Sequence, residues 1–147
     1  MSDAYTQSLL LFAYQRSARQ LTDHLWANGH SQIRPKHGAI FGNVDHGGTR
    51  ASVLARRAGM GKAAMGELID EVERLGYVVR RPDPSDRRAK LVVPTASGVE
   101  VARLVHEFNR LAEARYRRAL GAAAYGSLRA SLELLAERRD VQPRVRA

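Results

Sequence analysis

The sequence predicts a mainly α-helical fold with a small β element of two or three strands. Apolar residues recur three and four apart along most of the chain, and the spacing changes to strict alternation only around residues 77–93. The chain has 147 residues, 44% of them apolar, which is enough for one hydrophobic core. We therefore expect one domain.

The first expected helix covers residues 3–28. No Gly or Pro interrupts this stretch, and its apolar residues keep helical spacing until Gly29 ends it. A short helix over residues 36–44 is expected to begin after Pro35. These two segments lead into the central part of the chain.

A pair of helices joined by a tight turn is expected next. Thr49 is a suitable N-cap for a helix over residues 50–58, which Gly59 closes. The second helix of the pair covers residues 61–75 and ends before Gly76. Its apolar stripe consists of Ala64, Met65, Leu68, Ile69 and Val72.

A β-hairpin follows, because the apolar spacing switches from helical to alternating. Residues 77–81 and 90–93 alternate as strands do. The connection over residues 82–88 begins with turn formers and ends with two arginines. The sequence therefore predicts a hairpin whose loop carries arginine.

Two long helices complete the expected fold. Thr95 is a suitable N-cap for the first, in which apolar residues keep helical spacing from Val101 to Tyr116, and Gly121 separates it from the second. The expected order is helix, helix, helix, turn, helix, hairpin, helix, helix.

Charge and cysteine content narrow the classes of function. The chain has 24 Lys and Arg against 15 Asp and Glu, a formal net charge of +9, so a polyanion is the expected partner. Cysteine is absent, which excludes disulfides, thiolate zinc sites and cysteine nucleophiles.

The paired helices and the hairpin together form the pattern of a winged helix-turn-helix. The helix over 61–75 suits the major groove, and Lys62 lies at its N-terminal end, where free N–H groups and the helix dipole favour phosphate. Arg87 and Arg88 suit the negative potential of the minor groove. Double-stranded DNA is therefore the expected ligand.

Three spaced segments resemble the MarR family of bacterial transcriptional regulators. They are the glycine and strand over 75–81, the Pro-Ser-Asp-Arg-Arg-Ala tip over 84–89 and the Thr-Ala-Ser-Gly helix start over 95–98. Residues 52–60 are similar, less closely, to the first helix of the family's DNA-binding pair. The resemblance extends from about residue 35 to 101.

The resemblance implies a homodimer in which the chain forms one intertwined structural domain with three kinds of segment. Residues 1–34 would hold an N-terminal dimerisation helix, residues 35–94 a winged helix-turn-helix DNA-binding domain, and residues 95–147 C-terminal dimerisation helices. The two winged lobes would then bind a pseudo-palindromic operator whose half-site centres lie about 10 bp apart. A sequence-specific regulator, usually a repressor, is the implied function.

Individual roles follow from the same resemblance: Arg88 would enter the minor groove, Asp86 would hold the wing arginines in position, and Ser52 would touch phosphate. The candidate DNA-binding residues are Arg50, Ser52, Lys62, Ala63, Gly66, Glu67, Asp86, Arg87, Arg88 and Lys90. Gly61, Gly66 and Glu67 depart from the family pattern, which usually has Ser or Thr at the first two positions and often Arg or Lys at the third. Glu67 is either an acceptor for cytosine N4 or a solvated charge.

Metal and catalytic sites are not indicated, so neither a cofactor nor an enzyme is expected. The five histidines include no pair four residues apart and have no carboxylate at ligand spacing. Neither a nucleophile elbow nor a phosphate loop is present. Acidic and basic residues instead recur at the i, i+4 spacing of helix-surface ion pairs. These pairs are Asp70 with Arg74, Arg103 with Glu107, Glu113 with Arg117, and Arg129 with Glu133.

The resemblance also implies a small-molecule effector. Phe12, Trp26 and Phe41 are candidates to line a pocket for an aromatic or phenolic compound, and Arg16, four residues after Phe12, could meet its carboxylate. Core packing explains the aromatic residues equally well. Such a ligand releases DNA only when it prefers the arrangement of the lobes that cannot bind it.

A cytoplasmic protein without a membrane partner is expected, because the sequence has neither a secretory signal at its start nor an apolar stretch of spanning length. The alternative to an operator-binding regulator is a winged-helix module for protein interaction or for nonspecific nucleic-acid binding. Sequence specificity separates the two, since phosphate contacts serve any duplex whereas base readout favours one site.

Overall fold

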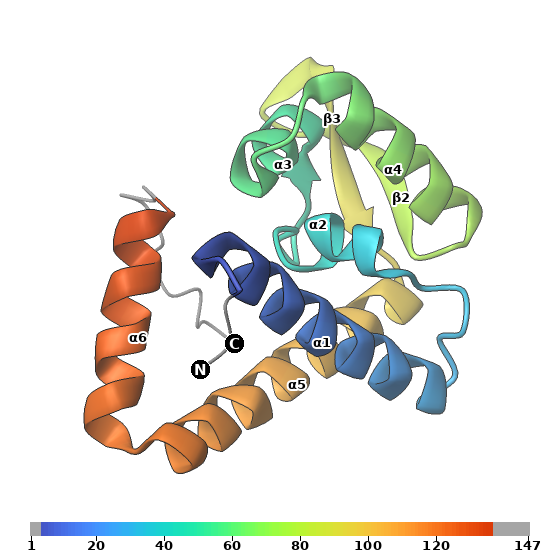
Figure 1. Cartoon of the computed structure of the whole chain (residues 1–147). Helices are drawn as coiled ribbons and strands as arrows, with labels where there is room; N and C mark the ends of the chain where they lie inside the picture. Colours follow the sequence, from blue (N-terminus) through green and yellow to red (C-terminus); the bar gives the residue numbers. More distant parts are fainter. Residues whose placement is uncertain (1–3, 137–147) are drawn as a thin grey trace. The chain divides into compact units, whose positions relative to one another are not determined.

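Residues 4–136 are described by a computed structural model, and they confirm the predicted fold class. The helices are joined by one antiparallel sheet of three strands in the order β1-β3-β2. The elements are α1 (Thr6–Ala27), η1 (Pro35–His37), α2 (Gly38–Phe41), β1 (Thr49–Arg50), α3 (Ala51–Ala58), α4 (Lys62–Arg74), β2 (Val78–Asp83), β3 (Asp86–Pro94), α5 (Ala96–Leu120) and α6 (Ala122–Leu135) (Figure 1). The chain divides into two compact units, residues 1–108 and 109–147.

The core of the first unit is formed by α3, α4 and the sheet together with the end of α1, α2 and the first half of α5. Its largest fully buried side chains include Ile40, Leu54, Met65, Ile69 and Val78. The predicted stripe of α4 is confirmed at its last four positions, whereas Ala64 is exposed in the first turn. The buried stripe leaves the opposite side of α4 facing outward.

Two expectations about helix boundaries are wrong. The expected helix over residues 36–44 is only a 3-10 turn followed by α2, which ends at Phe41. Thr49 does not cap α3, because it pairs with Val92 in the sheet and its hydroxyl donates to the Asp45 carboxylate at 3.1 Å. Thr49 is therefore a residue of the sheet, and Arg50 occupies the N-cap position of α3.

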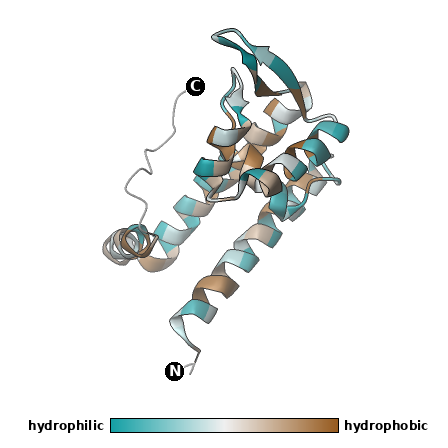
Figure 2. Ribbon diagram, turned by 90° about the horizontal axis from the view of Figure 1, so that it is seen from above, coloured by the Kyte–Doolittle hydropathy of each residue, from teal (hydrophilic) through white to brown (hydrophobic). Residues whose placement is uncertain are grey.

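The hairpin is longer and its turn tighter than predicted. Asp83 pairs with Asp86, so only Pro84 and Ser85 lie between the strands, and Arg87 and Arg88 belong to β3 rather than to a loop. The polar character of these strand ends, visible as the hydrophilic tip in Figure 2, hides them from an analysis of apolar spacing. Both arginines lie in a register shift of the hairpin, between the pairs that Asp86 makes with Asp83 and Lys90 makes with Pro82.

The start of α5 confirms Thr95 as its N-cap and explains the glycine that follows. The Thr95 hydroxyl accepts the N–H of Gly98 at 3.3 Å and donates to the carbonyl of Gly76 at 2.7 Å. A Cβ on Gly98 would lie 2.0 Å from the backbone oxygen of Tyr77. The Thr-x-x-Gly pattern therefore joins α5 closely to the end of the helix-turn-helix.

Substituting Gly98 by alanine is expected to lower the free energy of unfolding by about 1–3 kcal/mol or more, as overpacking against a fixed backbone does. The matched control is Gly66→Ala, because a Cβ on Gly66 meets nothing within 4 Å. This control should raise stability by about 1 kcal/mol, since alanine is the better helix former. Urea denaturation of the two variants measures both changes, and equal stabilities would contradict the close approach at Gly98.

The second unit is built on the junction between α5 and α6. Gly121 takes a φ of 78° there, and Tyr125 is buried with its hydroxyl donating to the Glu113 carboxylate. Arg129 also donates to Glu113, at 2.8 Å. The predicted pair of Glu113 with Arg117 is therefore wrong, because the guanidinium of Arg117 lies over the Tyr125 ring instead.

Two of the four predicted helix-surface ion pairs are present. Arg103 pairs with Glu107 at 3.0 Å and Arg129 with Glu133 at 3.2 Å. Asp70 pairs with Arg80 of β2, at 2.5 Å, rather than with Arg74. Within residues 4–136, no helix combines the length and the hydropathy that crossing a bilayer requires.

Candidate nucleic-acid interface

The helix-turn-helix presents its polar side outward. Gly59 ends α3 in the left-handed conformation, with a φ of 65°, and α4 then begins at Lys62. Lys62, Ala63 and Glu67 are exposed, and Gly66 is half-buried. Gly61, the N-cap residue of α4, provides no side-chain cap, so the first N–H groups of this helix are left for an anion.

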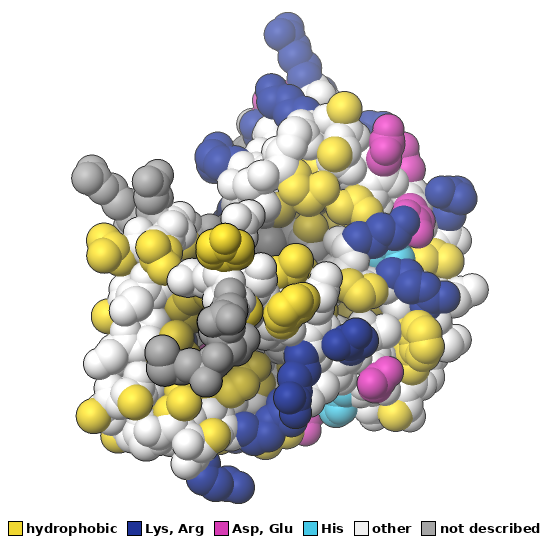
Figure 3. Space-filling model, viewed as in Figure 1, with side chains coloured by type: hydrophobic (Ala, Val, Ile, Leu, Met, Phe, Trp, Pro, Cys, Tyr) yellow, Lys and Arg dark blue, Asp and Glu magenta, His cyan; other side chains and the backbone are white. Residues whose placement is uncertain are grey.

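The basic residues of the hairpin project from its end. Arg87, Arg88 and Lys90 are all exposed on β3, and Ser52 is exposed at the start of α3. Figure 3 shows Lys and Arg side chains standing out from the end of the molecule at which the hairpin lies in Figure 1. The first unit thus combines an open helix N-terminus with a cationic hairpin.

Asp86, which the resemblance assigned to holding the wing arginines, contacts the backbone of one of them. Its Oδ1 accepts the N–H of Arg88 at 3.0 Å, and its Oδ2 lies 3.7 Å from Nη2 of Arg50. Asp86 therefore shapes the strand at Arg88 and leaves the side chains of both wing arginines exposed.

Asp83 is a site residue that the sequence analysis missed. Its carboxylate is buried and accepts the N–H and the hydroxyl of Ser85 at 2.8 and 2.7 Å, and Nε of Arg50 at 2.7 Å. The Ser85 hydrogen bonds and then Arg50 lower the pKa of Asp83 to about 2. The sequence signalled only a turn former, because Arg50 lies 33 residues away along the chain.

Ion pairs that the sequence did not predict hold α4 to β2 and to η1. Arg80 of β2 donates to Asp70 at 2.5 Å and also to Glu73. Lys36 of η1 donates to Glu71 at 2.6 Å, and Nε2 of the fully buried His37 lies 3.2 Å from the same carboxylate. The candidate recognition helix is therefore held from both the sheet and the linker after α1.

His37 makes the stability of this arrangement depend on pH. Burial lowers the pKa of His37 below 6.5, although Glu71 opposes the shift. The unfolded chain therefore takes up a proton that the folded chain resists, so the contribution of neutral His37 is complete above pH 6.5 and is lost as the pH falls.

Urea denaturation at pH 7.5 and 5.5 is expected to show lower stability at the acidic pH, and His37→Gln should make this difference smaller. The control is His46→Gln, which replaces an exposed histidine and should keep the full difference. The same pH difference in both variants would contradict the role of His37.

The effector candidates lie in unlike environments. Phe41 is buried and packs edge-on against Tyr77, with ring centroids 5.9 Å apart. Phe12 and Trp26 are exposed by 58% and 44%, and they lie about 21 Å apart along α1, which is too far to line one small pocket. Arg16 is exposed on the same helix, and the guanidinium of Arg34 lies 4.9 Å from the centre of the Trp26 ring.

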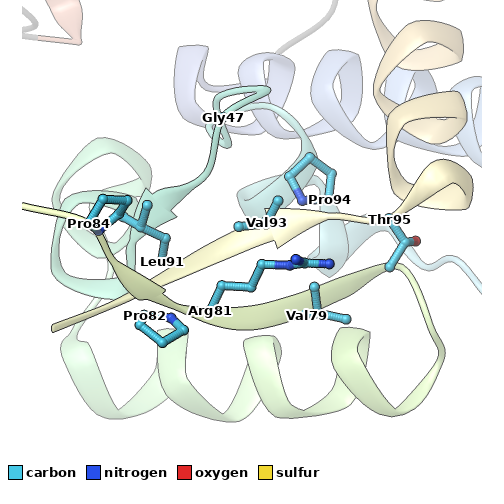
Figure 4. A pocket seen from close by; sticks show the side chains of 9 residues that line it. All are labelled: Gly47, Val79, Arg81, Pro82, Pro84, Leu91, Val93, Pro94 and Thr95. Atoms are coloured by element: carbon cyan, nitrogen blue, oxygen red, sulfur yellow. The ribbon is translucent and has the colours of Figure 1, made fainter. Parts of the chain in front are cut away.

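A shallow groove of about 440 Å³ lies on the outer face of the sheet and includes none of these candidates (Figure 4). Val79, Leu91 and Val93 form its apolar floor, and the side chain of Arg81 lies along the strands between them. Its lining residues belong to the hairpin and to the loop that contains Gly47, apart from Thr95, the N-cap residue of α5.

Comparison with known proteins shows what the helix-turn-helix region is similar to. The MarR family model matches residues 31–89. An uncharacterized HTH-type transcriptional regulator of Bacillus subtilis, YcgE, is 42% identical over 48 residues, which are 32% of this chain and 31% of that protein. The chain thus aligns with less than a third of the length of this relative.

Solved structures share the fold over nearly the whole chain. CouR from Rhodococcus jostii, bound to p-coumaroyl-CoA, has a TM-score of 0.74 at 24% identity and covers 96% of this chain and 100% of that one. The S. aureus MepR–DNA complex has a TM-score of 0.77 at 16% identity, covering 92% and 98%. The helix-turn-helix and the first part of the wing, residues 31–89, are therefore similar to the MarR family.

Proposed function

We propose that the protein is a DNA-binding transcriptional regulator that acts as a homodimer on a pseudo-palindromic operator. The observation that carries this proposal is the outward face of the first unit. There the uncapped N-terminus of α4 presents Lys62, and the hairpin presents Arg87 and Arg88. One lobe then places a helix in the major groove and the arginines in the adjacent minor groove. The MepR–DNA complex, which has the same fold, supports this use of it.

Exposed apolar side chains support the homodimer. They gather on α1, on the second half of α5 and on α6, which are the segments that the sequence assigned to dimerisation. They include Leu9, Leu10, Leu11, Phe12, Leu111, Leu120, Leu128, Leu132, Leu134 and Leu135, each at least 39% exposed. Soluble monomers rarely expose so much apolar surface, so a second copy of the chain is the proposed cover.

The proposed regulation is repression that a small aromatic acid relieves. CouR was solved with p-coumaroyl-CoA, an aromatic acyl compound, which supports this class of ligand. Trp26 is the single tryptophan of the chain, so its fluorescence reports ligand binding near α1. Titration with phenolic and other aromatic acids should change this fluorescence, and the same acids should release bound DNA. No change at millimolar ligand would contradict this part of the proposal.

Fluorescence anisotropy at near-physiological salt tests the DNA-binding proposal. The protein should prefer the DNA upstream of its own gene over a shuffled duplex of equal length by a factor of about 1000 or more. Equal, weak binding to both duplexes would favour the alternative, a winged-helix module for nonspecific nucleic-acid binding or protein interaction.

A further inference from the structure

The end of the hairpin receives little support from the sheet. Strand β1 pairs only with Leu91 and Val92 of β3, whereas Lys90 and Asp86 pair with β2 alone, and residues 87–89 lie in a register shift between these two pairs. A two-stranded ribbon is marginally stable on its own. The direction in which the tip carries Arg87 and Arg88 therefore depends on a contact outside the sheet.

One ion pair provides such a contact. Both Nε and Nη2 of Arg50 lie 2.7 Å from Oδ2 of Asp83. Arg50 immediately precedes α3, and Asp83 belongs to the residue pair that closes the hairpin. The ion pair thus joins the start of the helix-turn-helix directly to the tip of the hairpin.

The groups of this ion pair are already engaged inside the protein. The Asp83 side chain is 8% exposed, and its other oxygen, Oδ1, accepts both hydrogen bonds from Ser85. Nη2 of Arg50 also lies 3.7 Å from Oδ2 of Asp86. A phosphate that approached Arg50 would have to compete with these two carboxylates.

We propose that Arg50 and Asp83 are positioning residues that hold the tip of the wing at a fixed angle to the helix-turn-helix. Arg50, a candidate for direct DNA contact in the sequence analysis, then serves DNA binding through Asp83. This inference rests on the proposed function, because it assumes that the tip of the hairpin enters the minor groove of DNA.

The direction in which Asp83→Asn changes DNA affinity distinguishes positioning from a general effect of charge. Asp83 adds a negative charge close to a surface proposed to bind a polyanion, so charge alone predicts that Asp83→Asn tightens DNA binding. Positioning predicts the opposite, since loss of the ion pair leaves the tip free to move. Arg50→Lys provides a second test, because it keeps the positive charge but cannot make both contacts from one planar group.

Anisotropy with the upstream duplex is expected to show about tenfold weaker binding for Asp83→Asn and for Arg50→Lys, the order expected from losing one charge-assisted hydrogen bond. The double variant should bind no more weakly than either single variant, because both remove the same interaction. The matched control is Glu107→Gln, which breaks an exposed ion pair on α5 and should bind like wild type. Tighter binding by Asp83→Asn, wild-type binding by Arg50→Lys or additive losses would overturn the proposal.

Hydrogen exchange of the DNA-free protein gives a second readout. Backbone amides of residues 85–90 should exchange faster in Asp83→Asn and Arg50→Lys than in wild type, while amides of the α4 core keep their protection. If the amides of residues 85–90 exchange at the wild-type rate in both variants, the ion pair does not hold the tip, and this result would overturn the proposal whatever the DNA-binding measurements show. A wild-type protein without preference for its upstream DNA would count against the proposed function alone, since exchange would still decide whether Arg50 and Asp83 hold the tip. Arg50→Lys keeps the test available if Asp83→Asn does not fold.

Discussion

Replacing Leu128 and Leu132 together by glutamate is expected to convert the protein to monomers and to weaken operator binding by at least about 100-fold. These residues lie one helical turn apart on α6 and are 42% and 39% exposed, so the charges would face the proposed partner copy. Two lobes joined in one dimer gain about 10²–10⁴ in affinity from binding their half-sites together, and monomers lose this gain.

Light scattering and anisotropy on the same samples measure the two effects. Ala130→Glu is the matched control, because it adds a negative charge at an exposed position of α6 about 160° around the helix from Leu128 and from Leu132, and it should leave the protein dimeric. A Leu128→Glu/Leu132→Glu protein that stays dimeric would contradict the assignment of this face. A monomer with wild-type affinity would contradict the need for two lobes.

Replacing Arg88 by alanine is expected to weaken operator binding at least tenfold, because each lobe loses a minor-groove arginine worth about 1–3 kcal/mol. The loss should depend on the sequence of the flanking base pairs, since a narrow A·T-rich minor groove attracts arginine most strongly. Lys62→Ala should instead weaken binding to all duplexes alike and reduce the slope of affinity against salt by about one.

Arg74→Ala is the control for both variants. It removes an equal charge from the last residue of α4, about 18 Å from Lys62 along the helix. Anisotropy at several salt concentrations should place this variant close to wild type. An Arg88→Ala protein that matches Arg74→Ala would show that the wing adds only general charge.

The sequence predicts most of the helices because their signals are local. Gly59 and Gly121 mark helix ends by backbone conformation, and Thr95 caps α5 through its own neighbours. Thr49 shows the limit of this reasoning. Its capping signal was local, but its partner Val92 lies on a strand more than 40 residues away, and sheet pairing prevailed.

The exposed residues of the candidate site could be predicted from the sequence, because they belong to a motif with recognisable spacing. Lys62, Arg87 and Arg88 are exposed on the elements that the motif assigned to them, although the arginines lie in a strand rather than a loop. What holds these elements was not predictable. Asp83, for example, is held by Arg50 from a distant part of the chain, and the local pattern contains no signal for that contact.

In the proposed function, two lobes of one dimer recognise one DNA sequence. Selection of bound duplexes from a random library by the purified protein, followed by sequencing, tests this recognition. We expect an enriched inverted repeat whose half-site centres lie about 10 bp apart, one helical turn. Enrichment of no sequence, or of a single half-site without its repeat, would contradict the account.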